Sequence, residues 1–172
     1  MIFISGVHGV GKSYFCNLLK ERLGISAYTA SQLIAEAKQS GFSPDKKIAD
    51  INQNQLYLLE AVDNLKSQGT EFLLDGHFCL LNTDGEITRI PEETFTQLNP
   101  DAIVLLTEDP DIIAQRRYER DRVEHKPDDI DRFQKAEIDY ANEVAARLGV
   151  PLKVSRGSKD VENTIDFIRG RM

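Results

Sequence analysis

The sequence predicts an α/β fold in which a parallel sheet is covered by helices on both faces. Short apolar runs of the buried-strand type alternate along the chain with segments of helical periodicity. Glycines follow three of the helical segments, just before the next strand should begin, at Gly24, Gly69 and Gly149. Strand–helix alternation of this kind builds parallel sheets, because each helix returns the chain to the same edge of the sheet.

The individual elements follow from the same patterns. The expected strands are Ile2–Ser5, Phe72–Asp75, Ala102–Thr107 and Leu152–Ser155, with a weaker run at Ile25–Tyr28. Apolar stripes indicate helices over about 15–23, 58–65, 130–148 and 161–168, the third with a polar interruption at Glu137. Asp109 followed by Pro110 is typical of a helix start. A turn signal at Asp84–Gly85 lies between two short apolar segments and predicts a small hairpin.

Composition indicates one globular domain over residues 1–172, with 41% hydrophobic and 28% charged residues. A formal net charge of −7 makes nucleic acid and anionic membranes unexpected partners. The two cysteines, Cys16 and Cys79, lie in apolar surroundings and are expected to be reduced core residues of a cytoplasmic protein. We see no signal peptide and no membrane-spanning run.

The segment GVHGVGKS, from Gly6 to Ser13, fits the phosphate-loop pattern G-x-x-x-x-G-K-[S/T] between an expected strand and an expected helix. Glycines let backbone N–H groups converge on phosphate oxygens, and a helix N-terminus favours their negative charge. Lys12 should reach the β- and γ-phosphates of a nucleotide, and the Ser13 hydroxyl should coordinate Mg²⁺. His8 is most simply a variable loop residue. The expected nucleotide-binding residues here are Gly6, Gly9, Val10, Gly11, Lys12, Ser13 and Tyr14.

Asp75 stands at the carboxyl end of an expected strand, where parallel sheets gather their ligands. A carboxylate at that position can hold Mg²⁺ through its water shell, so we expect Asp75 and Ser13 to form the metal site, although Asp75 could simply cap a turn. His77 could orient the attacking group or a substrate phosphate, or it could be a structural hydrogen-bonding residue. Both interpretations stay open.

Four arginines occur within seven residues after the strand Ala102–Thr107: Arg116, Arg117, Arg120 and Arg122. Arg116 and Arg120 share one helix face. A solvated helix with Glu119 and Asp121 as ion-pair partners would give the same pattern. Because the preceding strand should end at the edge that carries the phosphate loop, we expect these arginines to clamp a transferring phosphoryl group. The polar segment VEHKPDDID should break the helix and allow a short lid at about residues 116–130.

Taken in order, GVHGVGKS, EFLLDGH, NPDAIVLLTEDPDII and RRYERDR resemble the nucleoside monophosphate kinases, a phosphate-loop family. The similarity is greatest to archaeal-type adenylate kinases and to small adenylate-kinase-like ATPases, in which Asp-x-His follows this strand. The resemblance implies a three-layer fold with a five-stranded parallel sheet of order 2-3-1-4-5. It also implies that Arg116 lies over the adenine of ATP, that Arg120 meets the phosphates, and that an adenine pocket is lined by Arg156, Gly157 and Ser158.

The same resemblance implies an acceptor-binding region within about residues 29–68. Ser31 and Gln32 stand there at an expected helix start, and Lys46 and Lys47 follow in a polar stretch rich in amides. A capped surface helix and a polar loop are the simpler explanation for any single one of these residues. Bacterial adenylate kinases continue the Asp-Gly segment with Phe-Pro-Arg, whereas this chain continues it with His77 and Phe78, so the acceptor must be held in another way.

The leading hypothesis is transfer of the γ-phosphoryl group of Mg·ATP to a small acceptor, most simply a nucleoside monophosphate. The expected catalytic residues are Lys12, Asp75, His77, Arg116 and Arg120. One alternative is an ATPase that acts as a switch or assembly factor. Another is a kinase for a non-nucleotide metabolite such as a sugar acid, although residues 29–55 contain no arginine to bind its carboxylate.

Overall fold

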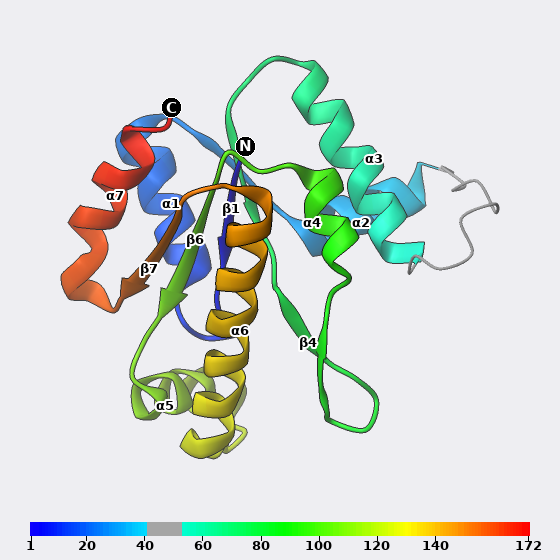
Figure 1. The fold of residues 1–172 in the computed structure, drawn as a ribbon. Helices are drawn as coiled ribbons and strands as arrows, with labels where there is room; N and C mark the ends of the chain where they lie inside the picture. The colour runs from blue at the N-terminus through cyan, green and yellow to red at the C-terminus, as the bar shows by residue number, and fades with distance from the viewer. Residues whose placement is uncertain (41–52) are drawn as a thin grey trace.

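A computed structural model describes residues 1–40 and 53–172, and its centre is a five-stranded parallel sheet (Figure 1). The strands are β1 (Ile2–Ser5), β2 (Ser26–Thr29), β3 (Phe72–Asp75), β6 (Ala102–Thr107) and β7 (Leu152–Arg156). They lie in the order β2-β3-β1-β6-β7, which is 2-3-1-4-5 when the strands of this sheet are counted along the chain. The predicted fold class is therefore confirmed. The labels skip two numbers because β4 (Cys79–Leu81) and β5 (Ile87–Arg89) form the separate predicted hairpin.

Seven α-helices connect or flank the strands in the described residues. They are α1 (Lys12–Leu23), α2 (Ala30–Gln39), α3 (Gln53–Ser67), α4 (Glu92–Leu98), α5 (Pro110–Asp121), α6 (Pro127–Leu148) and α7 (Val161–Arg169), and a short 3-10 helix, η1 (Ser158–Asp160), precedes the last. The predicted N-cap is present, since the Asp109 side chain accepts a hydrogen bond from the Asp111 N–H. Among the described residues, α4 is the helix that the sequence patterns did not indicate.

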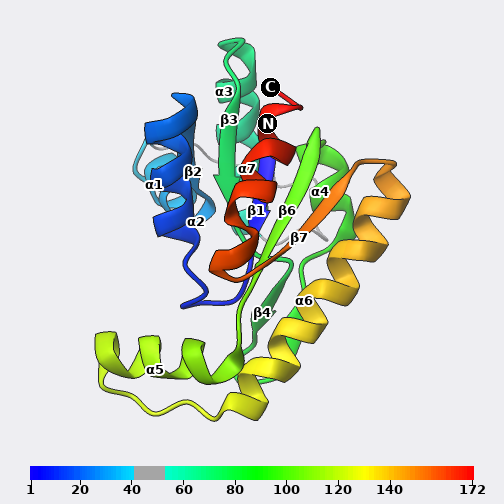
Figure 2. The ribbon, with the colours of Figure 1, turned by 90° about the vertical axis from the view of Figure 1, so that its left-hand side faces the viewer.

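The helices cover both faces of the sheet, as the two perpendicular views show (Figures 1 and 2). Helices α1 and α7 bury Phe15, Leu19 and Ile165 on one face, against Ile2 and Ile4 of β1. Helices α3, α4 and α6 pack on the other face, with Phe3 of β1 in the middle of their contact. Successive residues of a strand point to opposite faces, so the continuous apolar strands supply both layers.

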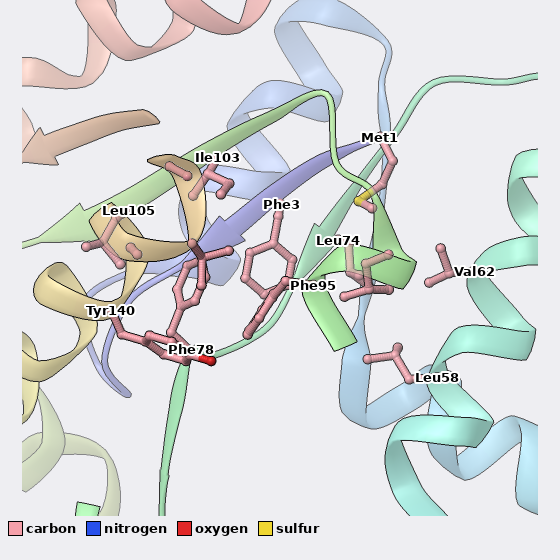
Figure 3. Packing of buried hydrophobic residues seen from close by; sticks show 14 of the residues in the cluster. Met1, Phe3, Leu58, Val62, Leu74, Phe78, Phe95, Ile103, Leu105 and Tyr140 are labelled. Carbon is pink, nitrogen blue, oxygen red and sulfur yellow. The ribbon is translucent and has the colours of Figure 1, made fainter. Parts of the chain in front are cut away.

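An aromatic cluster fills the second face directly behind the carboxyl edge of the sheet (Figure 3). Phe78 stacks on Phe95 with ring centroids 4.6 Å apart, and Phe3 meets both rings edge-on. The Tyr140 ring closes the cluster from α6, and its hydroxyl donates to the Ile90 carbonyl oxygen over 2.6 Å. These contacts hold the segment after β3 against α4 and α6.

Two exposed connections project from this body. The hairpin turn, Asn82 to Glu86, is exposed, and the Asn82 side chain accepts hydrogen bonds from the Asp84 and Glu86 N–H groups. Helix α5 ends where Arg122 adopts a left-handed φ of 57°, and the chain then runs to α6 without regular structure, so the predicted helix break is present. In the described ranges no helix is long and apolar enough to cross a membrane.

Candidate active site

The phosphate loop joins β1 to α1 at the carboxyl edge of the sheet. Gly9 and Gly11 have φ values of 86° and 106°, which favour glycine. A Cβ atom at Gly6 would lie 2.7 Å from the Leu106 carbonyl oxygen, so the loop can approach β6 only because this residue has no side chain. Helix α1 begins at Lys12, and its N-terminus therefore stands behind the loop. The predicted loop thus has the backbone and the helix dipole needed to bind phosphate.

Lys12 and Asp75 face each other beneath this loop. Lys12 Nζ donates a hydrogen bond to the Gly6 carbonyl oxygen over 2.7 Å and lies 3.9 Å from Asp75 Oδ1. Only 10% of the lysine side chain and 11% of the aspartate side chain are exposed. Burial lowers the pKa of Lys12 and raises the pKa of Asp75, and the attraction within the pair opposes both shifts.

A cavity of about 580 Å³ opens in front of the loop. Its near end is formed by the phosphate loop, Asp75, His77 and three arginines of α5. Its far end is formed by the start of α2, the start of α3, and α4, with an apolar floor of Phe3, Ile34, Leu58, Phe95 and Leu98. The volume lies within the range of small-molecule sites in proteins. Ser13 and Asp75 both line this cavity, and their oxygens are donors of the type that Mg²⁺ prefers.

Three buried polar side-chain atoms in the described part of the chain have no hydrogen-bond partner: Gln55 Oε1, His77 Nδ1 and Thr94 Oγ1. All three residues line the large cavity. Gln55 is 6% exposed and Thr94 is 2% exposed, so solvent does not satisfy these atoms. An unpaired buried polar group costs about 1–3 kcal/mol. The Gln55 and Thr94 atoms are therefore available to a ligand in the cavity, whereas His77 Nδ1 lies 3.8 Å from Glu137 Oε1.

The arginines of α5 differ in their surroundings. Arg116 Nη1 donates to the Val10 carbonyl oxygen over 3.2 Å, and Arg116 Nη2 lies 3.7 Å from Glu108 Oε2. Arg117 is half-buried, and its Nε donates to the His8 carbonyl oxygen over 2.7 Å. Arg120 is exposed, contacts the His8 ring, and pairs with Asp121 at 2.8 Å.

Arg116 and Arg117 therefore contact the backbone of the phosphate loop, whereas the Arg120 side chain is exposed to solvent. Arg116, Arg117 and Arg120 line the large cavity, and Arg122 is not among its lining residues. Arg117 was not among the catalytic residues expected from the sequence. It follows the buried Ile113 by one helical turn, and both side chains approach Gly9, a placement that the sequence spacing alone does not reveal. His8, expected to be a variable residue, makes contacts to two arginines here.

A second cavity of about 420 Å³ lies on the other side of the loop. Gly157 and Ser158, two of the three residues expected near adenine, line it together with Tyr14, Thr107 and Glu108. Gly157 has a φ of 65°, and a Cβ atom there would lie 3.0 Å from Glu108 Oε1. Arg156 is exposed and does not line this cavity; its backbone N–H donates to Asp160 Oδ2 over 3.1 Å. Gly11, Tyr14 and Arg116 line both cavities, which therefore adjoin.

Glu137 is a site residue that the sequence did not reveal beyond a polar interruption in an apolar stripe. It is fully buried, and it is the only charged side chain among the buried residues of the described chain. Its carboxylate accepts hydrogen bonds from Ser5 Oγ at 2.8 Å and from the N–H groups of Phe78 and Cys79 at 3.1 Å. His77 Nδ1 lies 3.8 Å from Glu137 Oε1.

The region expected to bind the acceptor is only partly described. Thr29 caps α2 by accepting a hydrogen bond from the Gln32 N–H, and Thr29 and Ser31 line the large cavity. The Gln32 side chain is exposed and donates instead to Glu36 Oε1 over 2.9 Å. Lys46 and Lys47 lie outside the described residues.

The fold and the loop define a phosphate-loop nucleotide-binding protein, and comparison with known proteins agrees. Residues 5–134 match the family described as AAA domain, and the chain belongs to this family. It is similar to the adenylate kinase of Methanopyrus kandleri, with 26% identity over 93% of this chain and 90% of that protein. It is also similar to the adenylate kinase of Pyrobaculum aerophilum, with 24% identity over 81% of this chain and 76% of that protein.

Solved structures resemble the fold at lower identity. A sugar kinase from Janibacter sp. HTCC2649 superposes with a TM-score of 0.57 at 14% identity, covering 99% of this chain and 92% of that one. A gluconokinase from Sinorhizobium meliloti 1021 gives a TM-score of 0.52 at 14% identity, covering 96% and 86%. These two similarities establish the shared architecture. The chain is thus related to phosphate-loop kinases by sequence and by fold.

Proposed function

We propose that this protein is an ATP-dependent phosphotransferase that moves a phosphoryl group from ATP to a small acceptor, most simply a nucleoside monophosphate. The observation that carries the proposal is that donor groups and acceptor groups line one cavity. Lys12, Ser13 and three arginines form one end, and the unpaired atoms of Gln55 and Thr94 lie among apolar side chains at the other. A protein that only sensed ATP would have no use for the far end.

The donor nucleotide would span both cavities. Its adenine would occupy the smaller cavity beside Gly157 and Ser158, with Arg116 at the point where the two cavities adjoin. Its phosphates would lie along Gly9–Ser13, where the backbone N–H groups and Lys12 Nζ can reach them. Lys12 would exchange its hydrogen bond with the Gly6 carbonyl oxygen for phosphate oxygens.

Charge neutralisation and positioning would supply the catalysis, because phosphoryl transfer needs little covalent help from a protein. Lys12, Arg117 and Arg120 would offset the charge that spreads over the transferring oxygens. Ser13 and Asp75 would hold Mg²⁺, which would supply positive charge to offset that of the phosphates. In the described chain no group of three or more His, Cys, Asp or Glu side chains could hold a metal ion, which suits an ion held mainly by phosphates and water.

The far end of the cavity supports a nucleobase better than a sugar acid. A planar base can lie on Phe95 and Leu58 and still present an N–H donor to Gln55 Oε1 and a ring acceptor to the Thr94 hydroxyl. A sugar acid would leave several hydroxyl groups and a carboxylate against apolar side chains, which is costly. The adenylate kinases among the relatives are consistent with a nucleotide acceptor.

Incubation with γ-labelled ATP, Mg²⁺ and a panel of monophosphates and sugar acids tests the proposal. We expect label to appear on at least one nucleoside monophosphate and on no sugar acid. Label on a sugar acid alone would move the acceptor assignment to that class. Release of free phosphate with no labelled acceptor would contradict the transferase and favour an ATPase switch.

A further inference from the structure

We propose that Glu137 and Gln134 of α6 are positioning residues that hold the chain segments at three strand ends in place, so that the separate parts of the site face one cavity. The inference rests on the proposed phosphotransferase function. It concerns two side chains that do not reach the reacting groups themselves. They are buried one helical turn apart on α6, the helix that follows the expected lid.

Glu137 ties the end of β1 to the segment after β3. One carboxylate oxygen accepts from Ser5 Oγ, the last side chain of β1, while the two oxygens together accept from the Phe78 and Cys79 N–H groups. Ser5 directly precedes the phosphate loop, and Phe78 lies three residues after Asp75. A single side chain therefore fixes the distance between the nucleotide-binding loop and the expected metal-binding carboxylate.

Gln134 ties the same helix to the end of β6. Its Oε1 accepts from the Glu108 N–H over 3.0 Å, and its Nε2 donates to the Glu108 carbonyl oxygen over 2.9 Å. Glu108 follows β6 and leads, through the Asp109 cap, into the arginine-bearing α5. Both polar positions of this side chain are used on the backbone, so Gln134 fixes where the arginine helix begins.

The three strands that these two residues join are neighbours in the sheet, in the order β3-β1-β6. Each supplies a different part of the site: Asp75 and His77, the phosphate loop, and the arginines. Buried hydrogen bonds to a charged group are the strong and directional kind, and they specify geometry as well as adding stability. Backbone pairing sets the register of the strands as far as Asp75 on β3 and Leu105 on β6. The two side chains act beyond those positions, on the chain segments that follow β3 and β6.

His77 extends the network toward the cavity. Its Nδ1 is buried without a hydrogen-bond partner among the described residues and faces Glu137 Oε1 at 3.8 Å. Catalytic hydrogen bonds are often long in the absence of substrate and shorten when it binds. A small rotation of the imidazole would bring Nδ1 into hydrogen-bonding distance of Glu137 and direct Nε2 toward the substrate.

Two substitutions of Glu137 separate the effect of its hydrogen bonds from the effect of its charge. Met removes both, whereas Gln removes the charge and keeps groups that can form hydrogen bonds. Met has a similar length and cannot accept the three hydrogen bonds, whereas Gln can accept from both N–H groups and donate to Ser5 Oγ. Because a misplacement of about 1 Å can lower a rate about 100-fold, we expect Glu137→Met to lower kcat by about 10- to 100-fold. The KM for ATP should change by less than about threefold, since ATP contacts the loop itself. Glu137→Gln should restore kcat to within about threefold of the wild-type value.

Amide hydrogen exchange gives a readout that does not depend on turnover. The Phe78 and Cys79 amides should exchange faster in Glu137→Met and at the wild-type rate in Glu137→Gln. Val144→Ala, which opens a buried space on α6 away from both cavities, is the matched control for lost stability and should keep the wild-type kcat. Equal kcat values for Glu137→Met and Val144→Ala would overturn the inference, as would a Gln variant as slow as the Met variant.

If Glu137→Met does not fold, Ser5→Ala decides the question. It keeps the carboxylate and removes one hydrogen bond at the end of β1, so we expect kcat to fall about 3- to 10-fold; an unchanged kcat overturns the inference. Failure of the proposed function looks different, because wild-type protein would then label no acceptor. In that case the exchange rates of Phe78 and Cys79 still report whether Glu137 holds the strand ends.

Discussion

Arg117 Nε donates a hydrogen bond to the His8 carbonyl oxygen, and this contact joins the arginine helix to the phosphate loop. The side chain also lies close to Gly9, where an added Cβ would stand 3.0 Å from Arg117 Cγ. Neighbouring Arg120 is exposed, pairs with Asp121 and contacts the His8 ring at the edge of the large cavity. The two arginines therefore have different expected roles. Arg117 holds the phosphate loop in its conformation, and Arg120 neutralises the charge of a bound phosphate.

Alanine at these two positions should separate the roles. Arg117→Ala should raise the KM for ATP and lower kcat, with kcat/KM falling about 100-fold, because the loop loses a contact and the phosphates lose a cation. Arg120→Ala should lower kcat with little change in KM. Steady-state kinetics measure both, and Arg132→Ala, an exposed arginine on α6, is the control. An Arg117 variant that behaves like the Arg132 variant would remove Arg117 from the site.

Lys12→Ala should abolish nucleotide turnover while leaving the fold intact. The lysine contacts the Gly6 carbonyl oxygen and Asp75 but packs no core, so its loss should reduce turnover by at least about 100-fold with a near-normal melting curve. Lys20→Ala, on the exposed face of α1, is the matched control and should retain activity. Full activity in Lys12→Ala would contradict the phosphate-loop assignment.

Asp75→Asn should stabilise the protein near neutral pH while lowering its activity. Burial raises the pKa of Asp75 above its ordinary 3.8 despite the attraction of Lys12, so the ionised carboxylate is less favourable in the folded chain than in the unfolded one. The stability contributed by the protonated form is fully present below pH 3.8 and is lost as the pH rises through the higher folded pKa. Unfolding free energies measured from acidic to neutral pH should therefore show a gain in Asp75→Asn that disappears toward low pH. A loss of stability at neutral pH would contradict this.

Thr94→Val and Gln55→Leu should weaken acceptor binding without weakening ATP binding. Each removes a buried polar atom that has no hydrogen-bond partner among the described residues, so stability should stay constant or rise. If the acceptor satisfies these atoms, its KM should increase about 10-fold or more for each change. Thr96→Val, at an exposed position of the same helix, controls for the altered helix propensity. An unchanged acceptor KM in both variants would place the acceptor elsewhere.

Strand positions could be predicted well because buried parallel strands are continuous apolar runs and stand out in the sequence. β1, β3 and β6 match the predicted ranges, β7 extends one residue further than predicted, and β2 is shifted by one residue toward the C-terminus. Helix α4 was missed because it has seven residues and buries only Thr94, Phe95 and Leu98, too few for a periodic pattern. It nevertheless supplies Thr94, whose Oγ1 is one of the buried cavity atoms without a hydrogen-bond partner among the described residues.

The site was predictable where a local motif defines it and not where packing does. The phosphate loop and Asp75 can be found from strand ends and glycine spacing. Which arginine of α5 faces the loop depends on how Ile113 docks that helix, which spacing does not reveal. Glu137 could be noticed as an acid in an apolar stripe, but its partners are 58 to 132 residues away in the chain.

The exposed turn from Asn82 to Glu86 separates two parts of the chain, each of which supplies neighbouring strands of the sheet. In the main sheet, the chain before the turn supplies β2, β3 and β1, and the chain after it supplies β6 and β7. The strands of the two groups pair with each other in that sheet through β1 and β6. The first half holds Lys12 and Asp75, and the second holds Arg116, Arg117 and Glu137. Cleavage at such a turn is the kind that folded chains tolerate. Neither fragment would contain a whole site, so turnover recovered on mixing them would directly report reassembly of the sheet.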